Sequence, residues 1–213
     1  MGEKSRKKVP EVVIKRLPRY YRYLDELDRE GKTRISSTAL SEKMGVTASQ
    51  IRQDFNYFGG FGQQGYGYNI KYLLDELKKL LGISKGYKTI IVGAGHLGHA
   101  LANYGGMKKR GFKVIGVFDN DKNKIGKKLC DVEIKDVNTV EEFIKENGVD
   151  IAVLALPKDA TREVSDKLLG SGIKGLWNFS FVEIESNNSV CVENVHLTDS
   201  LMTLSFKMNE EKK

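Results

Sequence analysis

Apolar residues recur at steps of three and four along the first third of the chain, the spacing of a buried helix face. The first pattern predicts an amphipathic helix from Pro10 to about Gly31, and Pro18 is expected to kink it because proline has no N–H to donate. A later pattern predicts another helix, closed by Gly82. The apolar positions are Val13, Leu17, Tyr20, Leu24 and Leu27 in the first helix and Tyr72, Leu73, Leu77 and Leu80 in the later one.

Two short helices with a tight turn at Gly45 are predicted between these two. Ser36 or Ser37 can cap the first, and Thr47 can cap the second, which runs from Ala48 to Phe58. One side of the second helix is apolar, and the other side carries Ser49, Gln50, Arg52 and Gln53. This is the helix-turn-helix pattern, and glutamine and arginine suit the base edges of a DNA major groove. A small helical hairpin without a ligand is the alternative.

Residues 59–68, GGFGQQGYGY, interleave glycines with aromatic residues and two glutamines. Such a segment favours a short hairpin, a wing beside a DNA backbone, with Gln63, Gln64 and Tyr66 as candidate DNA contacts. A flexible linker is the alternative, although linkers rarely hold so many aromatic residues.

From residue 88 onward, short apolar runs alternate with helical patterns. Strands are expected at 90–92, 114–118, 132–134, 151–156 and 175–179, with an edge strand at 190–192; helices are expected at 140–147 and 160–169. This alternation predicts a mostly parallel, doubly wound Rossmann-like sheet with right-handed crossovers. The expected fold class is therefore α/β, with a winged helix-turn-helix domain before the sheet.

The first expected strand ends in a glycine loop with the GxGxxG spacing. Gly93 allows a tight turn, Gly95 lets the backbone approach a pyrophosphate, and Gly98 lets the following helix pack closely on the strand. Asp119 follows the next strand, 21 residues past Gly98, where a dinucleotide site places its ribose acceptor. The alternative is a glycine-rich loop or a related nucleotide pocket. The candidate contacts at the loop are Gly93, Ala94, Gly95, His96, Leu97 and Gly98.

The acid bears on which dinucleotide binds. Asp119 and Asp121 repel a 2′-phosphate, so NADH and NAD+ are favoured over their phosphorylated forms. Lys122 and Lys124 are the exception, because either could fold back toward a phosphate. Pro157 ends another strand and is expected to border the nicotinamide, since ligands lie outside the strand carboxyl ends.

The tail from Thr198 to Met208 returns to helical spacing, with Thr198 as a candidate cap and an apolar stripe along one side. Docking on the chain's own sheet and an interface with a second subunit are both open. The expected domains are residues 1–82 (DNA binding), 83–194 (nucleotide binding) and 195–213 (terminal helix).

Charge and composition narrow the setting. The chain has 213 residues and a net charge of +7, and residues 1–82 hold 16 Lys and Arg against 10 Asp and Glu. A basic first domain suits nucleic acid. Two distant cysteines without metal spacing, and no membrane span or signal peptide, favour a soluble cytoplasmic protein. His96 and His99 lack a third ligand nearby, so no metal is expected.

Five segments in the same order resemble the Rex family of redox-sensing transcriptional repressors: VPEVVIKRLPRYYRYL, TASQIRQDF, FGGFGQQGYGY, VGAGHLGHALANY and NVHLTDSL. The resemblance covers about Val9 to Phe206. It implies a homodimer with exchanged terminal helices that represses genes for NADH reoxidation and fermentation until NADH binds. Two-fold symmetry then implies a palindromic operator.

The resemblance also assigns residues. Arg52 and Gln53 fall on the family's base-reading helix, and Gln63 and Gln64 fall on its wing. Tyr104 matches a tyrosine near the nicotinamide, and Arg16 matches an arginine at the domain junction. His196 stands where the family often has an acid that pairs with these two. We expect Leu197 of a partner's terminal helix at the nicotinamide ring as well.

Two other functions compete with the repressor. Tyr104 and Lys108 form a YxxxK pair, as in a small NAD-dependent dehydrogenase, but that pair belongs on a later helix and no substrate domain is available. A non-catalytic nucleotide- or CoA-binding module is the other. No enzyme activity is expected.

Overall fold

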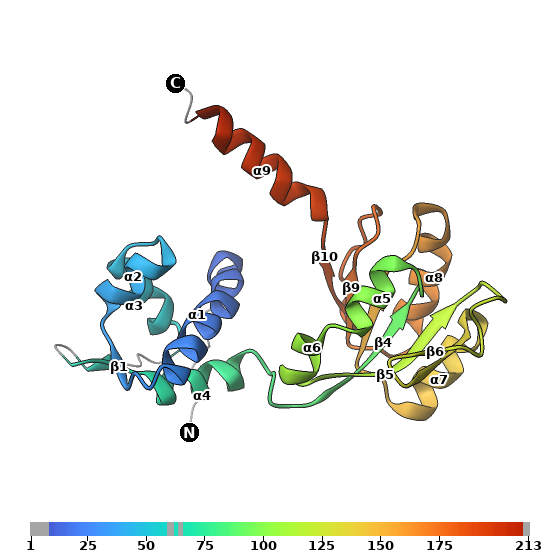
Figure 1. Cartoon of the computed structure of the whole chain (residues 1–213), viewed down its shortest axis with the longest axis horizontal. Coiled ribbons are helices and arrows are strands. Elements are labelled where there is room, and N and C mark those ends of the chain that lie inside the picture. Colours follow the sequence, from blue (N-terminus) through green and yellow to red (C-terminus); the bar gives the residue numbers. More distant parts are fainter. Residues whose placement is uncertain (1–8, 59–61, 64–65, 211–213) are drawn as a thin grey trace. The chain divides into compact units, whose positions relative to one another are not determined.

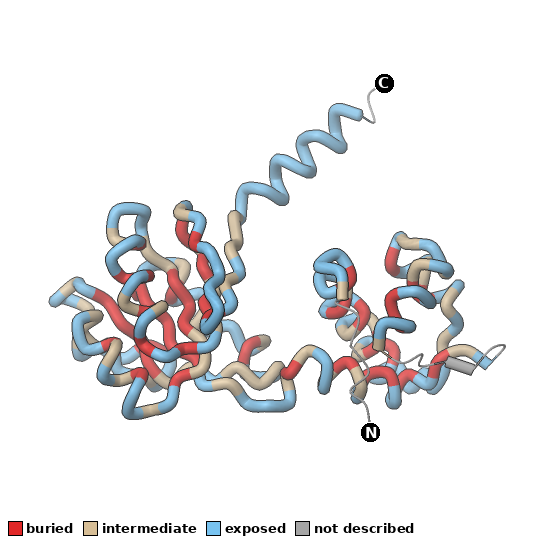
Figure 2. Tube along the Cα trace, turned by 180° about the vertical axis from the view of Figure 1, so that it is seen from behind, coloured by how far each residue is buried: buried red, intermediate tan, exposed pale blue. Residues whose placement is uncertain are grey.

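The computed structural model describes residues 9–58, 62, 63 and 66–210, and it divides into two compact units, Met1–Ser84 and Lys85–Lys213. Each unit has its own hydrophobic core, and buried positions concentrate on the inner helix faces of the first unit and on the central strands of the second (Figure 2). The units are therefore described separately.

The first unit is a winged helix-turn-helix domain, as the sequence predicts. Helices α1 to α4 pack around one core, and three short antiparallel strands pair in the order β1-β3-β2 (Figure 1). The elements are α1 (Glu11–Arg29), β1 (Arg34–Ile35), α2 (Ser37–Met44), α3 (Ala48–Asn56), β2 (Gly62–Gln63), β3 (Gly67–Asn69) and α4 (Ile70–Leu80).

Side-chain caps fix where the short helices begin. The Ser36 hydroxyl accepts from the N–H of Ala39 at the start of α2, and the Thr47 hydroxyl accepts from the N–H of Gln50 at the start of α3. Helix α2 ends at Gly45, whose φ of 64° lies in the left-handed region. The predicted tight turn between the two helices is confirmed.

The helices of the first unit can be compared with the predicted ones, and the end of α3 and the buried face of α4 differ from expectation. Helix α1 runs from Glu11 to Arg29 with Pro18 inside it, so the proline does not end the helix, and the kink expected at Pro18 stays a prediction. Helix α3 ends at Asn56, two residues before the predicted end. Helix α4 buries Ile70, Leu73, Leu74 and Leu77 and exposes Tyr72 and Leu80, so its buried face is rotated from the one predicted.

A charged group lies inside the first core. Asp54 of α3 is only 2% exposed, and its two oxygens accept from the Arg16 guanidinium at 2.7 Å each. The Tyr20 hydroxyl donates to the same carboxylate at 2.7 Å. Both donors belong to α1, so this cluster ties α1 to α3 through a bidentate charged pair.

The second unit is a Rossmann-like domain. In chain order, its first elements are β4 (Tyr87–Val92), α5 (His96–Ala102), α6 (Gly105–Lys109), β5 (Phe112–Asp119), β6 (Lys128–Leu129), β7 (Val132–Asp136) and a short 3₁₀ turn (Val137–Thr139). The remaining elements are α7 (Val140–Asn147), β8 (Ile151–Leu154), α8 (Lys158–Gly170), β9 (Gly175–Asn178), β10 (Cys191–Asn194) and α9 (Leu197–Glu210).

The seven strands follow the order β10-β9-β8-β4-β5-β7-β6, parallel throughout except for the β6–β7 pair. From β4 the chain passes to β5 on one side and later returns to β8 on the other. The strand order therefore reverses at β4, and such a switch point is where open α/β sheets bind ligands. The predicted doubly wound parallel sheet is confirmed.

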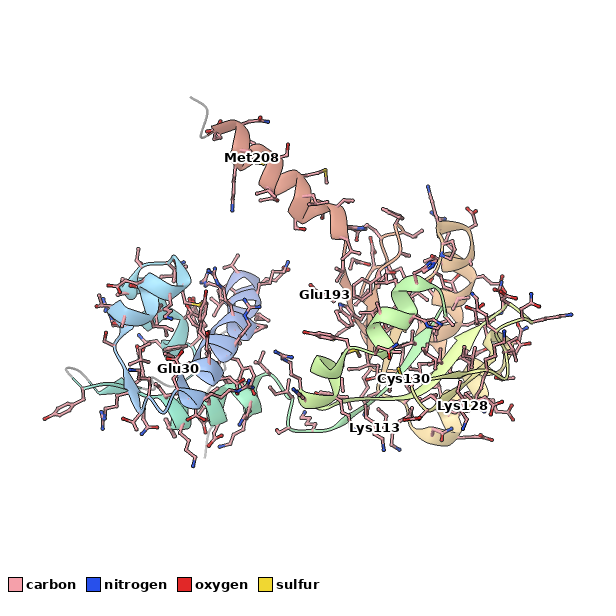
Figure 3. The ribbon with its side chains drawn as sticks, viewed as in Figure 1. Glu30, Lys113, Lys128, Cys130, Glu193 and Met208 are labelled. Carbon is pink, nitrogen blue, oxygen red and sulfur yellow. The ribbon has the colours of Figure 1, made fainter. Side chains whose placement is uncertain are left out.

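Some local features of this unit were not predicted. The helical segment after the glycine loop consists of two helices, α5 and α6, because the helix is interrupted at Asn103 and Tyr104. Strand β6 forms a hairpin with β7 through Cys130 and Asp131, which both have positive φ. Cys130, labelled in Figure 3, donates from its sulfur to the Asn103 side chain at 2.9 Å.

The terminal helix α9 begins at Leu197, one residue before the expected cap, so Thr198 lies inside the helix. All of its residues are exposed, as Figure 2 shows by colour. Its large apolar side chains gain no cover from the sheet, which rules out docking of α9 on the sheet of its own chain in this structure. Those side chains are Leu197, Leu201, Met202, Leu204, Phe206 and Met208.

The buried Asp54 cluster yields a stability prediction. Asp54→Ala removes the acceptor of three hydrogen bonds and leaves the Arg16 charge and the Tyr20 hydroxyl without it, so the free energy of unfolding should fall by about 3 kcal/mol. Urea denaturation followed by circular dichroism measures this. Asp25→Ala is the matched control, because it breaks a more exposed pair with Arg29 and should cost less than about 1 kcal/mol. Equal losses in the two variants would contradict the interpretation.

Candidate functional site

The glycine loop between β4 and α5 is shaped by two close backbone approaches. Gly93 has a φ of 106°, and a Cβ built there would lie 2.3 Å from the carbonyl oxygen of Ala155. A Cβ on Gly98 would lie 1.9 Å from the carbonyl oxygen of Gly93. Both positions therefore require glycine on grounds of space, and at Gly93 also on grounds of backbone conformation.

Gly95 differs from its two neighbours in the motif. It has no atom within 4 Å of a built Cβ and no positive φ, so the fold itself does not require glycine there. The space above Gly95 is open at the amino end of α5, where N–H groups without helical partners point. This is the cradle that a pyrophosphate needs for close backbone approach, and the geometry fits a dinucleotide.

Asp119 lies at the carboxyl end of β5 and is 6% exposed. Its Oδ2 accepts from the N–H of Ala94 at 2.7 Å and from the Lys124 ammonium at 3.1 Å, and its Oδ1 accepts from the N–H of Asp121 at 2.9 Å. Burial raises the pKa of this carboxyl, but the three hydrogen bonds outweigh burial, and the pKa lies below its ordinary value. The group is therefore an anion at neutral pH.

The loop and Asp119 are brought together by strand pairing. Val92 and Phe118 are partners in the parallel β4–β5 ladder, and the N–H of Gly93 donates to the carbonyl of Phe118. His96 is exposed and Leu97 is half-buried at the start of α5. Pro157, exposed, precedes α8 beyond the end of neighbouring strand β8. The structure thus gathers all the candidate adenosine and pyrophosphate residues at one edge of the sheet.

Two further candidates stand apart from this cluster. Tyr104 precedes α6 and is 58% exposed, and its ring lies so near Gly106 that a Cβ built there would be 2.5 Å from it. Leu197, the first residue of α9, is 60% exposed. Within one chain neither side chain is buried by the loop.

The two switch candidates each have a partner within their own unit. Arg16, expected at the domain junction, is half-buried and donates to the Asp54 carboxylate of its own unit. His196 places its Nε2 2.8 Å from the Glu183 carboxylate in the second unit. The sequence reasoning missed Asp54; its signal was a charged residue between Ile51 and Phe55, on the inner side of a helix.

The candidate DNA-reading face lies on α3. Ser49, Arg52 and Gln53 are exposed and Gln50 is half-buried. The Arg52 guanidinium donates to the Ser37 hydroxyl at 2.9 Å, which links α3 to the first residue of α2. This hydrogen bond orients the Arg52 side chain on the candidate DNA-reading face of α3.

The wing is described in part. Gln63 pairs with Gly67 in the β2–β3 hairpin, and Tyr66 is strongly exposed. The Arg34 guanidinium donates to the carbonyl of Tyr66 at 3.0 Å, which fixes the turn against β1. Gln64 lies outside the described residues, as does the side chain of Gln63.

Two searches over the described residues complete the survey. Within residues 9–58, 62, 63 and 66–210, no three His, Cys, Asp or Glu side chains are grouped to hold a metal ion. Over the same part of the chain, no helix is long and apolar enough to cross a membrane.

Comparison with known proteins gives matches over both units. The family model described as "Putative DNA-binding protein N-terminus" matches residues 8–56, and the model described as "CoA binding domain" matches residues 84–182. The redox-sensing transcriptional repressor Rex of Thermoanaerobacter pseudethanolicus is 55% identical over 204 residues, covering 96% of this chain and 91% of that protein. The repressor of the same name from Clostridioides difficile is 50% identical, covering 97% and 98%.

Solved structures match equally well. The structure of RSP in complex with β-NAD+ and operator DNA has a TM-score of 0.91 at 54% identity, covering 97% of this chain and 95% of that one. The structure of RSP with β-NADH has a TM-score of 0.90 at 50% identity, covering 97% of each.

A winged helix-turn-helix joined to a Rossmann-like domain with a glycine loop and a ribose-type acid defines a nucleotide-responsive transcription regulator. At this identity and coverage, the chain belongs to the Rex family of redox-sensing transcriptional repressors.

The contrast between the glycines can be tested. Gly95→Ala should leave the melting temperature near that of the parent protein, because its Cβ meets nothing, yet it should weaken NADH binding by about tenfold or more by blocking close phosphate approach. Gly98→Ala should lower stability by about 1–3 kcal/mol through overpacking against backbone. Thermal melts and calorimetric titration measure both, and undiminished NADH binding in Gly95→Ala would contradict the assigned cradle.

Proposed function

We propose that this chain binds a palindromic operator as a homodimer and leaves the operator when NADH binds, so that it reports the ratio of NADH to NAD+. The observation that carries the proposal is the presence, in one chain, of an exposed Arg52-bearing helix and a Gly95 cradle beside an ionised Asp119. The solved RSP structures, one with operator DNA and β-NAD+ and one with β-NADH, support it.

The DNA-binding role is assigned to residues 1–82, which hold the excess of basic residues. Helix α3 enters the major groove, where Arg52 and Gln53 read base edges with Ser49 and Gln50 beside them, and the wing residues Gln63, Gln64 and Tyr66 follow the backbone. In a symmetric dimer the two half-sites are separated by a whole number of helical turns.

The nucleotide-binding role is assigned to residues 83–194. The loop from Gly93 to Gly98 holds the pyrophosphate, and Asp119 accepts the adenosine ribose hydroxyls. These groups meet parts of the cofactor that NADH and NAD+ share. Discrimination must therefore arise at the nicotinamide, which is cationic when oxidised and neutral when reduced.

Tyr104, Pro157 and Leu197 of a second copy are assigned to that ring. Tyr104 and Leu197 are both exposed in the single chain, and they can enclose a dry pocket when α9 of a second copy packs over Tyr104. Burial of the cationic nicotinamide of NAD+ in such a pocket is costly. NADH thus favours closure more than NAD+ does. A ligand shifts an equilibrium only by its differential affinity, so this difference is the source of the switch.

Dimerisation is assigned to residues 195–213. A fourteen-residue helix with all residues exposed and a row of large apolar side chains needs a surface to cover. A second copy of the chain supplies one, and Met208 (Figure 3) lies near the far end of that helix. Each helix would then be exchanged onto the partner's nucleotide domain.

Arg16 is assigned to couple helix movements in the switch. Because Arg16 and Tyr20 of α1 both donate to Asp54 of α3, a displacement of α1 would move α3 with it. His196, beside Glu183 at the base of α9, is assigned to the same movement from the other unit. Closure around NADH would then shift the two recognition helices away from the operator spacing.

We propose no catalytic role and no metal cofactor. Tyr104 precedes α6 and Lys108 lies within it, directly after the glycine-loop helix, whereas a dehydrogenase carries its YxxxK pair on a later helix. As a regulator of bacterial genes, the protein is assigned to the cytoplasm, where that DNA lies.

Base reading by Arg52 has a measurable consequence. Arg52→Ala should weaken operator binding by about 1–3 kcal/mol while it changes binding to random duplex of equal length much less. Fluorescence anisotropy with both duplexes at fixed salt measures the difference. An equal loss on both would reduce Arg52 to a phosphate contact. Lys79→Ala on α4 serves as a control for the loss of one positive charge in the same unit.

The redox response is tested by titrating operator complexes separately with NADH and NAD+. Nearly complete release requires NADH to prefer the released state by roughly 10⁴. Tyr104→Phe and Leu197→Ser should blunt this release while operator binding without cofactor stays near normal. If both variants release DNA at unchanged NADH concentrations, the assigned nicotinamide pocket is wrong; if neither cofactor moves the parent protein, the proposed function itself fails.

A further inference from the structure

The Lys124 ammonium donates to Asp119, the residue proposed to accept the ribose hydroxyls of the dinucleotide. The ammonium lies 3.1 Å from Oδ2 of Asp119 and 3.9 Å from Oδ2 of Asp121, and the Lys124 side chain is half-buried. Of the three donors that the structure places on Asp119, two are backbone N–H groups fixed by the fold, and the third is this flexible side chain.

The acceptor capacity of Asp119 is nearly full. A carboxylate offers about four acceptor positions, two on each oxygen. Oδ2 already accepts from Ala94 and Lys124, whereas Oδ1 accepts from Asp121 and keeps one position. One ribose hydroxyl can therefore bind as the structure stands. The second hydroxyl of a bidentate ribose contact needs the position that Lys124 holds.

A displaced Lys124 does not travel far. Its backbone is fixed, because its N–H donates to the carbonyl of Asp121 in the turn after β5. The ammonium must then remain beside the ribose, within reach of whatever the 2′ position carries. A 2′-hydroxyl offers it a single neutral acceptor, but a 2′-phosphate offers close to two negative charges.

We propose that Lys124 sets how strictly this site rejects a 2′-phosphorylated dinucleotide, an inference that rests on the dinucleotide site of the proposed function. With Lys124 in place, the groups Asp119, Asp121 and Lys124 carry a net charge of −1; without it they carry −2. The site binds NADPH to the extent that the positive charge of Lys124 offsets the negative charges of Asp119 and Asp121. In the NADH complex the same lysine competes with the ribose hydroxyls for Asp119. Lys124 therefore lowers the affinity for NADH and raises the affinity for NADPH.

The test compares Lys124→Met with the parent protein by calorimetric titration with NADH and with NADPH. NADPH affinity should fall by about tenfold, because an attractive charge is lost and two repulsive charges stay. NADH affinity should stay equal or rise. Lys124→Arg keeps the charge and should keep the NADPH affinity within about threefold of the parent protein. Lys127→Met, an exposed lysine three residues further along, is the matched control and should leave both affinities unchanged.

The outcomes are distinguishable. If Lys124→Met lowers both affinities by the same factor, Lys124 only positions Asp119, and the inference is overturned. Unchanged or increased NADPH affinity also overturns it. If the parent protein binds neither NADH nor NADPH, the dinucleotide site of the proposed function fails before this question arises.

Discussion

The second unit depends on the parallel pairing of β4 with β5, sealed by the hydrogen bond from the Ala94 N–H to Asp119. Parallel strands end at the same edge of a sheet, so the glycine loop after β4 and the acid after β5 meet without any further element to guide them. Ala155, after β8, approaches the same loop from the other side and leaves no room for a side chain at Gly93. The loop is thus shaped by three neighbouring strands, and Asp119 is oriented before any ligand arrives.

In the first unit, helix α3 is only nine residues long and cannot be stable alone. Apolar packing of Ile51 and Phe55 fixes its depth, and the Asp54 cluster adds direction, because a bidentate guanidinium–carboxylate pair tolerates little rotation. Burial also raises the pKa of the Tyr20 phenol, with the Asp54 hydrogen bond adding to the shift, so that its hydroxyl stays a donor across the physiological range. The helix that carries the exposed Arg52 is therefore anchored by a charged group, Asp54, that is buried inside the unit.

The sequence predicted features that local rules govern and missed those that depend on distant partners. Glycine spacing, capping hydroxyls at Ser36 and Thr47, and the alternation of strands with helices are local, and the structure has them. Asp54 was missed because its partner Arg16 is 38 residues away and periodicity treats aspartate as a surface residue. The β6–β7 hairpin was missed because Cys130 and Asp131 take positive φ without the asparagine–glycine signal that marks such turns. The buried face of α4 was misjudged since tyrosine and leucine are tolerated at exposed positions.

The exposed terminal helix also bears on how much of this protein a cell can hold in working form. A single chain displays a row of leucine, methionine and phenylalanine side chains to water, which is the kind of surface that chaperones and proteases recognise. In the proposed dimer, pairing follows mass action, so the share of covered helices would rise with the amount of protein made. Unpaired copies would be cleared while paired ones persist. Expression level, and not cofactor alone, would then help set the number of operators that can be occupied.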